Sequence, residues 1–128
     1  MSAPILRLGD VLVTTIQSAL SDQDLVQLRD DFAAKVGLFR SRGVVIDVTA
    51  LDVLDSFATR TLRGIAYVAK LRGATTVVVG IQPEVAFAMV QLGLDLEDVA
   101  TALDLDEGLE YLRYSAGASA GGSQPHAG

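Results

Sequence analysis

The stretch GVVIDVTALDVLDSF, residues 43–57, leads from an apolar segment through an acidic loop to the start of a helix. Residues 43–48 form a short β-branched run, which is typical of a strand buried on both faces. The loop that follows carries Asp52 and Asp55, and Ser56 stands where the next amphipathic segment begins. We therefore expect a strand that ends near Asp47, a loop, and then a helix.

Strand and helix patterns alternate along the rest of the chain. Short apolar or alternating runs bounded by turn residues predict strands, in residues 5–8, 11–17, 43–48, 74–81 and 99–104. Apolar residues at helical spacing, with capping residues, Pro or Gly at the ends, predict helices, in residues 21–39, 56–72, 83–92 and 105–114. The order β-β-α-β-α-β-α-β-α predicts an α/β fold: a mostly parallel mixed sheet with about four helices, its first strand joined through a hairpin.

The chain of 128 residues is expected to form a single domain, which we place at residues 1–114. Residues 115–128, SAGASAGGSQPHAG, are small and polar. Such a segment buries too little apolar surface to fold, so we expect a disordered tail.

The composition excludes several classes of function. The chain has no cysteine, which rules out a disulfide framework, thiol catalysis and cysteine-bound zinc. Its one histidine, His126, lies in the predicted tail, where nothing holds an imidazole against a nucleophile. The net charge of −6 argues against nucleic-acid binding. No signal peptide or membrane-spanning run is recognisable, so we expect a cytoplasmic protein.

Ser56 occupies the position where function is expected, because ligands of open α/β sheets bind beyond the carboxyl ends of the strands. As a catalytic nucleophile, Ser56 would need a general base to take up its proton, and it lacks one. Either Asp55 or Ser56 could cap the helix, which would stabilise it by about 1 kcal/mol. As a phosphate acceptor, Ser56 would lie in the first helical turn, near the positive end of the helix dipole, with Arg60 one turn further on. The residues alone leave the cap and the phosphate acceptor both open.

Charge near Ser56 raises two further expectations. Asp47, Asp52 and Asp55 could bind Mg²⁺ or a small ligand, since hard cations prefer carboxylate oxygens. This is the alternative function. Response-regulator receiver domains use a similar acidic cluster, but the acidic pair at the end of their first strand and the lysine after a late strand are missing here. Residues 60–72 contain four basic and no acidic residues. We expect this basic stretch to lie beside Ser56.

Residues 43–57 resemble the signature of STAS domains, in which a central strand ends in Asp and Asp-Ser opens the next helix. Residues 78–112, VVGIQPEVAFAMVQLGLDLEDVATALDLDEGLEYL, are similar to the RsbS type of single-domain stressosome scaffold, a group of anti-sigma-factor antagonists. The resemblance covers about residues 4–113.

The resemblance implies a non-catalytic protein without a cofactor. It implies assembly with an RsbR-type STAS co-antagonist, retention of an RsbT-type serine kinase, and a serine phosphatase that resets the state. Ser56 would be the phosphorylated residue, and Asp55, Phe57, Thr59 and Arg60 would be its neighbours on the switch surface.

Overall fold

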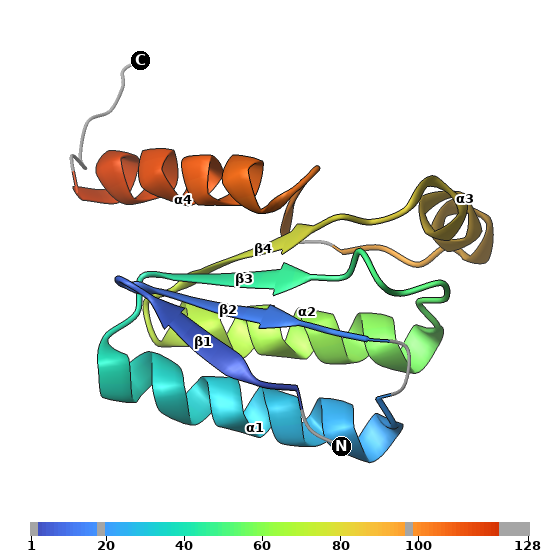
Figure 1. The fold of residues 1–128 in the computed structure, drawn as a ribbon, viewed down its shortest axis with the longest axis horizontal. Coiled ribbons are helices and arrows are strands. Elements are labelled where there is room, and N and C mark those ends of the chain that lie inside the picture. The colour runs from blue at the N-terminus through green and yellow to red at the C-terminus, as the bar shows by residue number, and fades with distance from the viewer. Residues whose placement is uncertain (1–2, 18–19, 97–98, 121–128) are drawn as a thin grey trace.

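A mixed β-sheet with helices on both faces forms the body of the molecule (Figure 1). The computed structural model describes residues 3–17, 20–96 and 99–120. In this part of the chain five strands occur in the spatial order β1-β2-β3-β4-β5. The strands are β1 (Ile5–Leu8), β2 (Val11–Thr15), β3 (Gly43–Asp47), β4 (Thr75–Val79) and β5 (Ala100–Ala102). The helices are α1 (Asp22–Phe39), α2 (Ser56–Leu71), α3 (Pro83–Leu92) and α4 (Leu105–Ala120).

The predicted order of elements and the fold class are confirmed. β1 and β2 form the antiparallel hairpin, and β2 to β5 are parallel to their neighbours, with Val45 of β3 opposite Val13 of β2 and Val77 of β4. The strands connected through α1 and α2 are parallel, because each helix returns the chain to the end of the sheet where the previous strand began, and here they are also neighbours.

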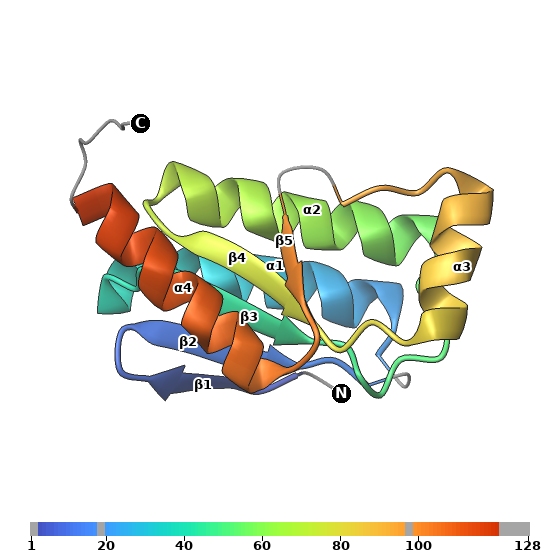
Figure 2. The same ribbon diagram turned by 90° about the horizontal axis from the view of Figure 1, so that it is seen from above.

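The two faces of the sheet are covered unequally (Figure 2). α1 and α2 pack side by side on one face, over alternate strand residues such as Leu12, Val44 and Val78. α4 lies across the other face, where Leu112 contacts Val45 and Val77. Since β3 is buried on both sides, its uninterrupted β-branched run is explained.

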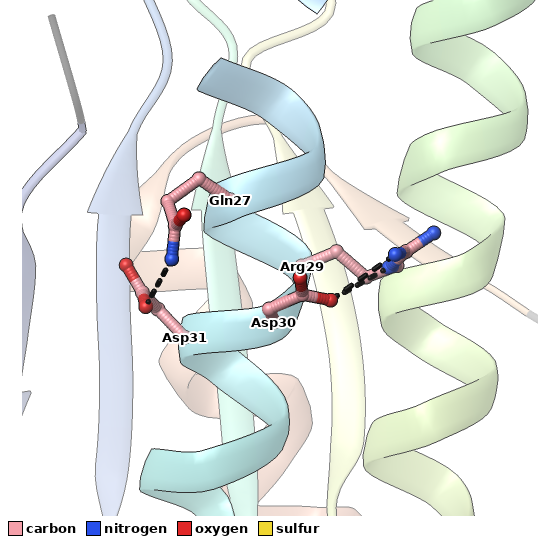
Figure 3. Close-up of polar contacts among 4 residues, drawn as sticks. All are labelled: Gln27, Arg29, Asp30 and Asp31. Carbon is pink, nitrogen blue, oxygen red and sulfur yellow. Dashed lines mark hydrogen bonds and ion pairs between the residues drawn. The ribbon is translucent and has the colours of Figure 1, made fainter. Parts of the chain in front are cut away.

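The outer side of α1 is polar, as a solvent-facing helix surface should be. Arg29 donates hydrogen bonds of 3.2 and 3.1 Å to Asp30, and Gln27 donates one of 3.0 Å to Asp31 (Figure 3). Ser21 caps the helix in a capping box with Asp24, whose pKa is lowered chiefly by the hydrogen bond from the Ser21 backbone. The capping box fixes where α1 begins.

The C-terminal boundary differs from the prediction. We expected the last helix to end at residue 114 and the tail to begin at 115, but α4 continues to Ala120. Adding residues to an existing helix needs no new nucleation, and this segment is rich in alanine, the best helix former. The rest of the predicted tail, residues 121–128 with His126, lies outside the described residues.

A candidate phosphorylation site at the start of helix α2

The loop that joins β3 to α2 is held close to the sheet. Asp47, the last residue of β3, accepts hydrogen bonds from the Thr49 backbone at 2.9 Å and from the Thr49 hydroxyl at 2.6 Å. The side chain of Gln82 donates to the Thr49 carbonyl from the start of α3. Gly80 lies against Thr49 with a positive φ of 81°, leaving no room for a side chain. The loop therefore leaves the sheet in a defined direction.

Apolar anchors alternate with exposed residues along this loop. Leu51 and Leu54 are buried in the main core, whereas Asp52 and Val53 are exposed. This alternation holds the backbone down while presenting a carboxylate and an apolar side chain outward. The loop is thus an ordered surface beside the start of α2.

The structure distinguishes the two candidate caps of α2. Asp55 has the extended backbone of an N-cap, and its Oδ1 accepts a 2.8 Å hydrogen bond from the backbone of Ala58. Ser56 is the first residue of the helix and is exposed. Its hydroxyl makes no hydrogen bond with any residue that the structure describes. Because Asp55 performs the capping, the Ser56 hydroxyl remains accessible.

The predicted neighbours of Ser56 are not all on the surface. Phe57 is half-buried and packs against the main core, and Arg60 is exposed one turn along the helix. Thr59 is only 1% exposed, so its predicted place on the switch surface is wrong. It shares the buried stripe of α2 with Leu62 and Ala66, three and seven residues further on. This spacing, visible in the sequence, was the signal that could have placed it.

A cavity of about 340 Å³ opens beside the start of α2. Leucines of α1, α2 and the loop supply its apolar lining, and the carboxylates of Asp22, Asp52 and Asp55 contribute to its wall. No basic residue among those that the structure describes lines it. A protein segment that carries apolar and basic side chains has the right chemistry to enter it. The sequence did not reveal this cavity, because its walls come from segments thirty residues apart.

The three aspartates of the alternative interpretation do not form a metal site. Within the described ranges, no group of three or more acidic or histidine side chains is placed to hold a metal ion. Asp47 is engaged with Thr49, and Asp55 caps α2. The proposal of metal binding through Asp47, Asp52 and Asp55 is therefore corrected.

The basic stretch is divided between the two ends of α2. Arg60 and Arg63 lie in the half of the helix that contains Ser56, whereas Lys70 and Arg72 are near its other end. A helix of this length spans about 24 Å at 1.5 Å per residue. The expectation that the whole stretch lies beside Ser56 is wrong, and only its first two arginines do.

Similarity to known proteins covers nearly all of the described fold. The family model of the STAS domain matches residues 3–108. The "RsbT co-antagonist protein RsbRA" of Bacillus subtilis is 27% identical over 111 residues, which is 86% of this chain and 40% of that protein. The chain thus spans about two fifths of the length of this curated relative. No helix among the described residues is long and apolar enough to cross a membrane.

Two solved structures are similar in sequence as well as in fold. A serine-to-glutamate variant of RsbS from Moorella thermoacetica is 39% identical, with a TM-score of 0.77 over 89% of this chain and 97% of that one. A chain in a structure of the stressosome, described as a signal integration and transduction hub, is 41% identical, with a TM-score of 0.76. That match covers 88% of this chain and 98% of the other.

Proposed function

The chain belongs to the STAS-domain family, and from this we propose that it is a non-catalytic, phosphorylation-switched scaffold of a stressosome. It holds an RsbT-type serine kinase and releases that kinase when Ser56 is phosphorylated. The observation that carries the proposal is the exposed Ser56 hydroxyl at the first position of α2, left accessible because Asp55 caps the helix. The similarity to RsbS and to a chain of the stressosome supports it.

Phosphate on Ser56 acts mainly by changing the charge of this surface. A phosphoserine carries about −1.5 to −2 at neutral pH. Asp55 already accepts the N–H of Ala58, so few free N–H groups remain for the phosphate. Asp55 also repels it, whereas Arg60, one turn away, offers a flexible partner. The expected result is a more negative surface on an otherwise unchanged fold.

This added charge weakens the hold on a partner docked beside Ser56. The adjoining cavity has an apolar lining and three carboxylates. In our proposal it forms part of the docking surface for the kinase, because it lies beside the start of α2. A kinase bound over Ser56 makes close contacts there that a dianionic group disrupts by desolvation and by steric conflict. Release therefore requires no unfolding of this chain.

Assembly uses other surfaces of the domain. The outer side of α3 exposes Phe87 and Val90, which are 72% and 77% accessible, beside the exposed Ala86. An apolar helix surface of this kind suits a protein partner. In our proposal the partners are further copies of this chain and an RsbR-type co-antagonist, consistent with the similarity to RsbRA. A serine phosphatase removes the phosphate and restores kinase binding in the cytoplasm.

The test is phosphorylation of the full chain by ATP and an RsbT-type kinase, followed by mass-spectrometric mapping. We expect phosphate on Ser56, none on Ser56→Ala, and kinase binding to Ser56→Asp weakened at least tenfold, about 1.4 kcal/mol. Thr75→Ala is the matched control, because Thr75 is an exposed hydroxyl residue at the opposite end of the sheet. Phosphorylation of Ser56→Ala at the wild-type rate would show that the acceptor is another residue.

A further inference from the structure

The C-terminal ends of α1 and α2 lie at the other end of the sheet (Figure 1). Residues from these two helix ends, and from the turns that follow them, line a second hollow. Its volume is about 370 Å³. Arg40, Arg42 and Arg72 line it together with Ser41, and no acidic residue of the described chain does. Three permanent positive charges thus surround one hollow in a protein whose net charge is −6.

Arg72 is placed in this hollow by close packing against α1. Its guanidinium lies over Gly37, where an added Cβ would be 1.8 Å from Nη2 and 2.8 Å from Cζ. The side chain makes no ion pair or hydrogen bond with any residue that the structure describes. Gly37 therefore makes room for a cation that has no anionic partner within the described fold.

Arg40 and Arg42 reach the same hollow from the turn between α1 and β3. Arg42 donates through Nε to Asp10 at 2.6 Å, which leaves its two terminal nitrogens without a partner among the described residues. Arg40 ends α1 in the left-handed conformation, with φ of 52°. Glycine is the usual residue for that position, because an L side chain is strained there. The chain nevertheless has an arginine at this position.

Ser41 is the one residue in the lining of this hollow whose hydroxyl is buried without a partner. Its side chain is buried, with 4% exposure, and its Oγ has no hydrogen-bond partner. A buried hydroxyl without a partner is unfavourable and calls for an explanation such as a bound group. Here the unpaired hydroxyl belongs to a residue that lines the hollow together with the three arginines.

We propose that this hollow binds a phosphoryl group, through Arg40, Arg42, Arg72 and the hydroxyl of Ser41. Three arginines that line one hollow offer more donors, in more directions, than a planar carboxylate can accept. A tetrahedral phosphate has enough oxygens to accept from all of them. The site is separate from Ser56 and does not depend on the function proposed above.

A purely structural role would be to complement the negative C-terminal ends of α1 and α2. That role explains a cation at each helix end. It does not explain why the strained left-handed position holds an arginine. The two roles also differ in how substitutions change stability.

The test is titration of the full-length protein with inorganic phosphate at constant ionic strength, followed by backbone amide NMR shifts. We expect saturable shifts in residues 36–43 and 71–75. Arg72→Gln should weaken binding about tenfold, and Ser41→Ala about three- to tenfold. Arg113→Gln is the matched control, since Arg113 is exposed on α4 and paired with Glu110; it should leave affinity unchanged. A titration with O-phosphoserine distinguishes a phosphorylated protein side chain from free phosphate as the source.

Thermal unfolding of the same variants separates binding from structure. Ser41→Ala removes an unpaired buried hydroxyl, and Arg40→Gly relieves the left-handed strain, so both should keep or raise the melting temperature without phosphate while losing affinity. Absence of saturable shifts, or shifts that Arg72→Gln and Ser41→Ala leave intact, would overturn the proposal.

Discussion

The two ends of the sheet differ in charge and in the kind of serine that each presents. At the end where the parallel strands finish, here called the carboxyl end, Ser56 is exposed beside the carboxylates of Asp52 and Asp55. At the end where these strands begin, here called the amino end, Ser41 is buried beside arginines. A hydroxyl that is to be modified must be accessible to an enzyme, whereas one that holds a ligand is better enclosed. The same residue type is thus suited to opposite tasks by its surroundings.

Distance keeps the two ends independent. α2 runs from one to the other over about 24 Å, which is about three Debye lengths at physiological ionic strength. Charge added to Ser56 is therefore largely screened at the arginine hollow. Loss of either proposed activity by mutation should leave the other intact.

The largest effect expected from a change at either end concerns two glycines. Gly80→Ala at the carboxyl end combines a positive φ of 81° with a clash, because its Cβ would lie 2.0 Å from Oγ1 of Thr49. Gly73→Ala at the amino end has a positive φ of 90° but no atom within 4 Å. We expect losses in unfolding free energy of about 3 and 1 kcal/mol, respectively. Urea denaturation measures both.

Equal losses for the two glycine variants would mean that the loop at Thr49 moves away at little cost. The carboxyl end would then be less rigid than its hydrogen bonds indicate. Phosphorylation of Ser56 in Gly80→Ala provides the functional counterpart of this measurement, since the loop leads directly to the acceptor.

A smaller effect is expected from the cap of α2. Asp55→Ala removes the acceptor for the Ala58 N–H and should cost about 1 kcal/mol, whereas Asp55→Asn retains a good N-cap and should cost a few tenths. Asp55→Asn also removes a negative charge beside Ser56, so it separates capping from electrostatics in kinase assays. Ser21→Ala, at the capping box of α1, is the control for loss of a cap away from Ser56. A similar loss for Asp55→Ala and Asp55→Asn would assign the effect to charge.

The sequence predicted the sheet and the helices because local patterns determine them. The β-branched run of residues 43–48 and the helical spacing in residues 21–39 need no knowledge of distant contacts. The start of α2 was located to within one residue, and only the choice between Asp55 and Ser56 as cap stayed open. The hydrogen bond from Ala58 to Asp55 decided it. For the cap itself, the sequence lacked only the direction of one side chain.

The amino end was missed because its arginines are distant in sequence. Arg40 and Arg42 precede β3, and Arg72 comes shortly before β4. Parallel neighbouring strands begin at the same edge of a sheet, so the predicted topology could have brought these residues together. The basic residues of the stretch 60–72 do not form one surface, because a helix of that length has two distant ends. Residues need to be placed on elements before their charges are added.

The smallest effect concerns Thr59, which provides a direct control for Ser41. Both hydroxyls are buried without a partner, but Thr59 lies under the start of α2 and Ser41 lies among arginines. Thr59→Val keeps the shape and removes the hydroxyl, so stability should stay the same or rise by up to ~1 kcal/mol. Phosphorylation of Ser56 and phosphate affinity should not change. Slower phosphorylation of Thr59→Val would show that its hydroxyl serves the switch from beneath. Weaker phosphate binding by Thr59→Val would contradict the distinction between the two ends, because a buried hydroxyl outside the arginine hollow would then affect phosphate affinity.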